Sequence, residues 1–413
     1  SCKSVGTLNV ELTVWPMVLP DEGELTAIGE VDHAGLFRHH LPGVATNATS
    51  ATTWHDQASS NEYDQLLSTT LQLLQRHRVA SVLTSLNPRV KVSARGELEV
   101  DWSNYDRVVA PLMNGQAFAN RVALPVWPLP LNAVLHPTDG NMFSAPGSQA
   151  LAKRYVEECA KHFQENGWLE RAFALVDSSN TVTSESMNAA KRAVDLVRSA
   201  RKDVRIAARR FPQDMKPYGW FDFSRNEVSD VDIWISDAQF YDDRAMRAQR
   251  AMGRRTWLAV DRPPFSGSAA LHARPGDTLV LGWQAGLLDA EFLWLGCVNC
   301  WPPDASPDPA SCARFDPTAL LFPGTAFGLN EPVPTLRLKR VRETMQYAAY
   351  VKLLTQHGRE HIAQALRTSL VEYAGTAAYR THFTDGRPIG WPEKQELFES
   401  ARRIMAGEML GLA

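Results

Sequence analysis

Three aspartates stand directly after short apolar runs, where a strand of an α/β protein delivers its catalytic groups. Asp177 follows FALV, Asp237 follows DIWIS and Asp261 follows WLAV. Carboxylates can supply both the general acid and the charge-stabilising base of glycoside cleavage. An aspartate that ends a strand can instead cap the helix that follows it. Both roles stay open for Asp237 and Asp261, whereas Asp177 is the first candidate for a catalytic role.

Tryptophan is unusually frequent in the chain, with 12 residues. Its large apolar face and single N–H donor suit stacking on sugar rings as well as core packing. Several tryptophans and polar residues fall at the expected strand ends, and these are the candidate substrate contacts. They are Asn87, Trp127, Arg209, Trp294, Asn299 and Trp301. Together with the carboxylates they predict a glycan site, with no metal and no cofactor.

The elements that must position these residues alternate between strand-like and helix-like segments. Such alternation is typical of a parallel α/β architecture. Eight strands are expected near residues 8, 80, 122, 172, 204, 231, 256 and 292, the first of them within Thr7–Leu19 and the third over Arg121–Leu131. Asp32–Ser60 is expected to be a long loop. Helices are expected over Tyr63–His77, Val100–Met113, Ala150–Asn166, Ser184–Arg201 and Asp242–Met252. Eight strands with intervening helices predict a (β/α)8 barrel, whose active site lies at the carboxyl ends of the strands. An open doubly wound sheet is the alternative, but the sequence has no G-x-G-x-x-G and no P-loop motif.

The length of 413 residues fits one barrel with an extension. The barrel is predicted over residues 1–330 and a C-terminal helical extension packed on it over residues 331–413. Pro334–Gln356, His361–Tyr373 and Glu393–Met405 are the helical segments expected there.

Composition narrows the classes of partner. Lys+Arg 43 against Asp+Glu 46 gives a formal net charge of −3, which offers no electrostatic basis for nucleic-acid binding. Hydrophobic residues at 44% and charged residues at 22% are ordinary for a folded globular chain. No uninterrupted apolar run is long enough to span a bilayer.

The cysteines offer two kinds of site, a metal site or a disulfide. Cys297, Cys300 and Cys312 lie close together in a proline-rich loop. They are too few for a structural zinc site, which normally takes four ligands. A disulfide from Cys312 to Cys297 or Cys300 is expected in a secreted protein. Cys2 is a candidate for a lipid anchor, the one membrane attachment expected, and the predicted location is extracytoplasmic: secreted, periplasmic or lipid-anchored.

Several segments resemble the catalytic barrel of the family-123 glycoside hydrolases, which are β-N-acetylgalactosaminidases. The likeness rests on the order of LTVWPMVLP at 12–20, LQRHRV at 74–79, VDIW at 231–234, FLWLGCVNCW at 292–301, LFPG at 321–324 and PTLRLKRVR at 334–342. It covers nearly the whole chain and is closer in style to a bacterial branch that shares this barrel. The resemblance implies a (β/α)8 barrel, a glycan substrate and no cofactor.

The resemblance also implies a substrate-assisted mechanism. In the family, an aspartate orients the 2-acetamido group of the sugar, and the adjacent glutamate protonates the leaving oxygen. The matching segment here is FALVDSSN at 173–180. Asp177 matches the aspartate, but Ser178 stands where the acid is expected. A serine hydroxyl ionises far above neutral pH and cannot replace a carboxylic acid as proton donor.

Three hypotheses follow. The chain cleaves a polysaccharide or an amino-sugar-containing glycan with a relocated acid, for which Asp237, Asp261 and Glu185 are the candidates. Alternatively, Asp177 is the nucleophile or base of a different glycosidase mechanism. In the third, the chain is a catalytically inactive glycan-binding barrel, lectin-like or a structural lipoprotein.

Overall fold

Eight parallel strands form the centre of the protein. The structure is a computed structural model and describes residues 11–20, 25–41, 61–93, 95–137, 141–145, 147–177, 182–215, 220–222, 227–228, 230–301, 318–385 and 389–411. The strands are β1 (Thr26–Glu30), β2 (Val79–Val82), β5 (Trp127–Pro128), β6 (Ala172–Asp177), β7 (Ile206–Ala208), β10 (Ile233–Asp237), β11 (Arg255–Ala259) and β12 (Phe292–Cys297).

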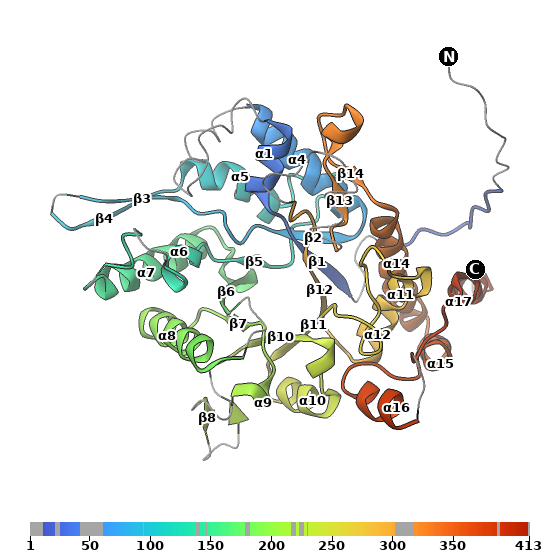
Figure 1. Cartoon of the computed structure of the whole chain (residues 1–413). Helices are drawn as coiled ribbons and strands as arrows, with labels where there is room; N and C mark the ends of the chain where they lie inside the picture. Colours follow the sequence, from blue (N-terminus) through green and yellow to red (C-terminus); the bar gives the residue numbers. More distant parts are fainter. Residues whose placement is uncertain are drawn as a thin grey trace.

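The strands follow one another around a ring. Each pairs with the next in chain order except β2 with β5, and β12 returns to pair with β1. The sheet is therefore a nearly closed barrel with helices around it (Figure 1). The predicted (β/α)8 fold is confirmed.

The inside of the barrel is filled by apolar side chains that alternate along the strands. Alternation is expected because successive side chains of a strand point to opposite faces. The cluster consists of Ile28, Val82, Val126, Phe173, Ala207, Ile233, Ile235, Trp257, Ala259, Phe292 and Trp294. The barrel is thus a packed core, and polar groups can gather only at its two ends.

The first strand is not where the sequence analysis expected it. Residues 11–20 contain no strand, and residues 7–10 lie outside the described part of the chain. Pro16 and Pro20 lack the N–H that a central strand must donate. Trp15, Met17 and Leu19 pack against the C-terminal helices instead. The true first strand, β1, is buried on both faces, so it carries no apolar–polar alternation that would have revealed it.

Long amphipathic helices surround the barrel largely as predicted. They include α4 (Asn61–Arg76), α5 (Ser103–Met113), α7 (Gln149–Glu165), α8 (Ser184–Ala200) and α10 (Asp243–Ala251). In α4, the leucines that face the core recur at helical spacing, and they are Leu66, Leu67, Leu71 and Leu74. One further helix, α1 (His33–His40), lies in a stretch expected to be loop, and the Asp32 side chain caps it by accepting from the Gly35 N–H at 2.9 Å.

Shorter elements complete the surface. A hairpin of β3 (Arg89–Val92) and β4 (Leu98–Asp101) projects from the barrel (Figure 1). The third barrel strand, expected over Arg121–Leu131, is reduced to the two residues of β5 because prolines interrupt it. The remaining elements are α6 (Asn132–Leu135), α9 (Pro212–Met215), β8 (Phe221–Asp222), β9 (Glu227–Val228), β13 (Leu321–Phe322) and β14 (Val333–Pro334).

The C-terminal helices build a second core against the barrel's last helices. They are α14 (Leu336–Gln356), α15 (Glu360–Leu370), α16 (Ala377–Asp385) and α17 (Gln395–Leu410). They pack on α11 (Pro275–Leu279) and α12 (Leu281–Leu287), where the Trp283 ring stacks on Tyr347 with centroids 3.7 Å apart. The division at residue 330 stays a prediction. Of the helices that the structure describes, none is long and apolar enough to cross a bilayer.

The cysteine pairing differs from the expected one. The structure bridges Cys297 to Cys300, whose Cα atoms lie 5.8 Å apart, within the ordinary range for a disulfide. Because Cys297 and Cys300 pair with each other, neither forms the bridge to Cys312 that was expected. Cys312 and the candidate anchor Cys2 lie outside the described residues, and Cys159 is a buried free thiol.

Two glycines that follow helices give a matched stability prediction. Gly115 after α5 and Gly253 after α10 both have positive φ, +73° and +79°. A Cβ on Gly115 would lie 2.3 Å from the Arg121 carbonyl oxygen, whereas a Cβ on Gly253 meets nothing within 4 Å. We expect Gly253→Ala to cost about 1–2 kcal/mol of unfolding free energy through backbone strain. Gly115→Ala should cost a further ~1–3 kcal/mol through the clash. If urea unfolding shows the same loss of unfolding free energy for both variants, the predicted clash between the new Cβ at position 115 and the Arg121 carbonyl oxygen is contradicted.

Candidate active site

The carboxyl ends of the barrel strands form the mouth of the barrel, and four charged side chains there share one placement. Each stands two residues beyond an apolar residue of the barrel interior, so the alternation of the strand directs it inward. The four are Glu30, Arg209, Asp237 and Asp261. They come from the first, fifth, sixth and seventh strands of the barrel or from the residues directly after them. The mouth is the end at which enzymes of this architecture carry their catalytic groups.

Arg209 and Asp237 form an ion pair in the mouth. The Arg209 Nη2 and Nε atoms donate to Asp237 Oδ1 at 2.9 and 3.1 Å. The Asp237 side chain is only 4% exposed, whereas that of Arg209 is 29% exposed. Asp237 precedes the short 3-10 helix Ala238–Phe240, but its side chain makes no capping hydrogen bond there. The contacts of Asp237 therefore support an ion pair with Arg209 and not a helix cap.

Asp261 lies beside this pair. Its Oδ2 accepts from the Gln239 backbone N–H at 3.1 Å, which ties it to the loop after β10. Burial raises the pKa of Asp261 above the ordinary aspartate range, and the negative charge of Asp237 raises it further. The next helix, α11, begins only at Pro275, so Asp261 does not cap it.

Glu30 is the member of the mouth that the sequence analysis missed. It ends β1, next to Val82 of β2 and Cys297 of β12. Its carboxylate accepts a hydrogen bond from the Thr84 hydroxyl. Burial is the largest influence on its pKa and raises it above the ordinary glutamate range. Because the first strand was expected some fifteen residues too early, Glu30 had no strand end to mark it.

Asp177 also ends a barrel strand but has a different partner. A β-bulge lies between Leu175 and Asp177, and bulges re-aim the side chains that follow them. Asp177 Oδ2 accepts from Arg210 Nε at 2.7 Å and Nη2 at 2.6 Å. Arg210 Nη2 also reaches Ser186 Oγ of α8 at 3.3 Å. The pair ties β6 and β7 to α8. Ser178 lies outside the described residues, and Glu185 is exposed in the first turn of α8.

Three of the predicted substrate contacts are buried and hydrogen-bonded within the protein. Trp127 is fully buried and its Nε1 donates to the Tyr105 hydroxyl at 2.9 Å. Trp301 Nε1 donates to the Leu321 carbonyl oxygen at 2.9 Å. Asn299 binds both the N–H and the carbonyl of Asp32, at 2.9 and 3.0 Å, and so joins the loops after β12 and β1.

The other three lie in different places. Trp294 is a buried member of the barrel interior, where it stacks on Trp257 with centroids 6.2 Å apart. Asn87 follows β2, is half-buried, and donates from Nδ2 to the Ser85 carbonyl oxygen at 3.0 Å. Arg209 alone of the six is joined to a mouth carboxylate by an ion pair that the structure describes. The tryptophans therefore support the barrel and offer no open face for a sugar ring.

The burial of Trp127 leads to a direct test. Trp127→Phe removes the N–H that satisfies the buried Tyr105 hydroxyl. We expect the variant to lose about 1–3 kcal/mol of unfolding free energy. Once a substrate is in hand, its kcat/KM per folded molecule should be that of the parent. Unchanged stability with a large loss of kcat/KM would instead make Trp127 a sugar contact.

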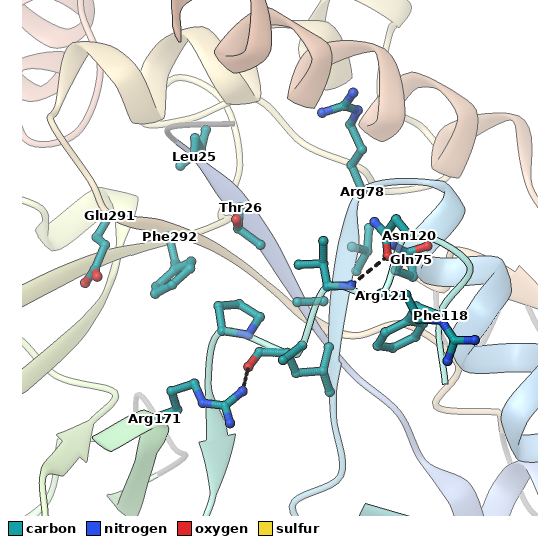
Figure 2. Close-up of a pocket in the computed structure, with 16 residues that line it drawn as sticks. Leu25, Thr26, Gln75, Arg78, Phe118, Asn120, Arg121, Arg171, Glu291 and Phe292 are labelled. Carbon is teal, nitrogen blue, oxygen red and sulfur yellow. Dashed lines mark hydrogen bonds between the residues drawn. The ribbon is translucent and has the colours of Figure 1, made fainter. Parts of the chain in front are cut away.

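A larger cavity opens at the opposite, amino-terminal end of the barrel (Figure 2). It measures about 650 Å³, against about 170 Å³ for the cavity at the mouth beside Glu30. Arg171 reaches across its edge and donates to the Leu124 carbonyl oxygen at 3.0 Å, a contact drawn dashed in Figure 2. Of the described residues that line it, Glu291 alone carries a carboxylate, and that group is paired with Arg255 at 2.5 Å. Glycoside cleavage needs two carboxylates, so this cavity lacks the groups that the mouth has.

Metal ligands do not gather in the part of the chain that is described. There, no three His, Cys, Asp or Glu side chains form a group that could hold a metal ion.

Comparison with protein families decides the relationship. The model of the glycoside hydrolase 123 catalytic domain matches residues 89–354, which is more than half of the chain. The chain belongs to this family. The resemblance drawn from the sequence is therefore confirmed, and the match runs from β3 to near the end of α14. Curated proteins give no match to this family-123 chain.

Solved structures agree in fold. A family-123 glycoside hydrolase from Clostridium perfringens, whose structure is described as giving the details of glycolipid glycan hydrolysis, aligns with a TM-score of 0.62 at 14% identity. The alignment covers 98% of this family-123 chain and 71% of that one. A GH39 beta-xylosidase from Caulobacter crescentus aligns with a TM-score of 0.43 at 11% identity, over 80% of this chain and 71% of its own. The first alignment supports the barrel fold alone. The TM-score of the second is too low to support any conclusion about this chain.

Proposed function

We propose that this family-123 chain is a glycoside hydrolase that cleaves its glycan at the mouth of the barrel. The observation that carries the proposal is a set of interacting carboxyl groups at the mouth. Asp237 pairs with Arg209, whose charge also acts on Glu30, and the charge of Asp237 acts on Asp261. Environments that push neighbouring carboxyl groups toward different protonation states are typical of acid–base catalysis. Burial raises the pKa of Glu30 and Asp261, whereas Asp237 is held in an ion pair with Arg209.

The substrate that we propose is an amino-sugar-containing glycan. Family membership supports a glycan, and the sequence resemblance implies a 2-acetamido sugar at the cleaved bond. The Clostridium perfringens protein, described for glycolipid glycan hydrolysis, is consistent with this substrate class.

A second candidate function is glycan binding without cleavage. It is favoured by the engagement of both Asp177 and Asp237 by arginines, at 2.6 and 2.9 Å. A carboxylate held in this way is less available to a substrate. Ser178, next to Asp177, also removes the carboxylic acid that the resemblance places there.

A product assay separates the two functions. The parent chain is incubated with a panel of bacterial and host polysaccharides and with aryl 2-acetamido-2-deoxy-β-D-galactosides, and released sugars are measured by mass spectrometry. Release of sugar supports the hydrolase. Retention of a glycan in a binding assay, without any release, supports the binding protein. A chain that neither cleaves nor binds any of them contradicts both.

We also propose an extracytoplasmic location, supported by the bridge between Cys297 and Cys300. Disulfides form and persist in oxidising compartments and are rare in the cytosol. Peptide mapping of the natively expressed protein, alkylated without reduction, should find the bridged peptide. Recovery of both cysteines as free thiols would contradict this location.

A further inference from the structure

Glu30 has contacts that hold its carboxyl group at one place in the mouth. It ends β1, and the pairing with Val82 and Cys297 fixes the backbone on both sides. The Thr84 hydroxyl, beyond the end of β2, donates to the carboxyl group. The group is thus positioned by two neighbouring strands, a rigid setting of the kind that catalytic groups need.

The surroundings of Glu30 form a small cavity with both polar and apolar lining. The cavity measures about 170 Å³, and its apolar lining is Pro128, Leu129, Leu131, Leu135 and Leu175. Its polar lining besides Glu30 is Thr84, Asn132 and His136. The apolar side chains among them disfavour the charged carboxylate, because they cannot replace the hydration that burial removes. A carboxylic acid in such a setting keeps its proton at a pH where an exposed one has lost it.

The charged and titratable groups around Glu30 act in opposite directions. Burial raises its pKa most, and the nearby negative charge of Asp32 adds to that effect. The hydrogen bond from Thr84 and the positive charge of Arg209 act the other way. His136 lines the same cavity and is exposed to solvent.

We propose that Glu30 is the proton donor to the leaving oxygen of the cleaved glycoside. This inference rests on the proposed function. The Glu30 proton passes to the glycosidic oxygen while the electron pair of the C1–O bond moves to that oxygen, so the alcohol leaves neutral. Water then adds its oxygen to C1 and loses a proton to a carboxylate of the mouth. The sum is hydrolysis of one glycosidic bond by one water molecule.

The Arg209–Asp237 pair completes the assignment. Arg209 donates to Asp237 Oδ1 at 2.9 Å, and its positive charge also acts on Glu30. Asp237 is the ion-paired member and supplies negative charge to the oxocarbenium-like transition state. Glu30 is the member whose pKa burial raises. Two carboxyl groups with different environments can thereby divide the acid and charge-stabilising roles.

The test compares leaving groups. The parent and Glu30→Gln are assayed on 2-acetamido-2-deoxy-β-D-galactosides of phenol, 4-nitrophenol and 2,4-dinitrophenol. A poor leaving group needs the proton and a good one does not. We therefore expect kcat/KM of the variant to fall about 10²- to 10⁴-fold on the phenyl glycoside and far less on the dinitrophenyl glycoside. Glu99→Gln, on the exposed face of the β3–β4 hairpin, is the matched control and should behave as the parent.

Thr84→Val is a second variant, for which we expect a shift of the pH profile and not a loss of the proton donor. Removing the hydroxyl takes away a contact that lowers the pKa of Glu30, so this pKa rises further. The loss of activity at high pH should then move to higher pH in the kcat/KM profile. In the parent this high-pH limb reports the proton on Glu30, and with the phenyl glycoside it should vanish in Glu30→Gln.

Infrared spectroscopy follows the proton without turnover. The difference spectrum between the parent and Glu30→Gln, recorded over a pH series, should keep the carbonyl band of a protonated carboxyl group to a higher pH than an exposed glutamate does. Loss of that band in the range of an exposed glutamate overturns the assignment. An active parent whose Glu30→Gln variant loses the same factor on all three leaving groups, or loses nothing, overturns it as well. A parent that cleaves none of the glycosides contradicts the proposed function itself, which is a distinct result.

Discussion

Asp237→Asn is expected to lower kcat/KM on any glycan that the parent cleaves by about 10²- to 10⁴-fold. The substitution keeps the size and the hydrogen-bonding oxygen of the side chain but removes its charge. The Arg209 guanidinium would then face the bound substrate without its partner carboxylate. Because Arg209 is 29% exposed, water can solvate it, and we expect little loss of unfolding free energy.

The measurement is initial rate against substrate concentration, with thermal unfolding of each variant recorded alongside. Asp195→Asn is the matched control, since this aspartate lies exposed on α8 in a surface pair with Lys191. The control should keep parental kcat/KM. A fully active Asp237→Asn enzyme would exclude Asp237 from the chemistry, whereas an unfolded one would assign the residue to stability.

Arg210→Met is expected to give the largest loss of stability, about 3–5 kcal/mol of unfolding free energy. The Arg210 side chain is 1% exposed and that of Asp177 is 8% exposed. Removing the guanidinium leaves the Asp177 carboxylate buried without the charge that compensates it. Such an uncompensated charge costs more than the intact pair contributes.

Urea unfolding measures this loss, and a double variant apportions it. In Asp177→Asn with Arg210→Met, neither charge remains, so part of the loss should be regained. Arg247→Met removes the partner of Asp243 in an exposed pair and should leave the free energy of unfolding nearly unchanged. A loss in Arg210→Met no greater than in this control would show that the Asp177–Arg210 pair is not a buried electrostatic unit.

Helices and strands with a regular pattern of apolar residues could be predicted, because burial of the apolar face places the element against the core. The leucines of α4 and the apolar run before Asp177 mark one helix and one strand, and the structure places both within two residues of expectation. The first strand could not be found in the same way. The segment 12–20 is apolar but packs on a second core that the pattern does not distinguish from a barrel.

Within the site, a carboxylate at a strand end could be recognised from the sequence, whereas the role of a tryptophan could not. Asp237 and Asp261 were found because a strand that ends in a carboxylate delivers it to the mouth. Tryptophan serves core packing and sugar stacking with the same surface, so Trp127 and Trp301 could not be assigned from sequence. Glu30 was missed because its strand was misplaced, and Arg210 because its role depends on the bulge in β6.

The central claim is that the glycan binds at the mouth and not in the larger cavity at the other end of the barrel. A crystal structure of the chain soaked with N-acetylgalactosamine tests this most directly. The account predicts the sugar ring at the mouth, within hydrogen-bond reach of Glu30, Arg209 or Asp237. A sugar found in the amino-terminal cavity beside Arg171 and Glu291, with the mouth empty, would contradict it.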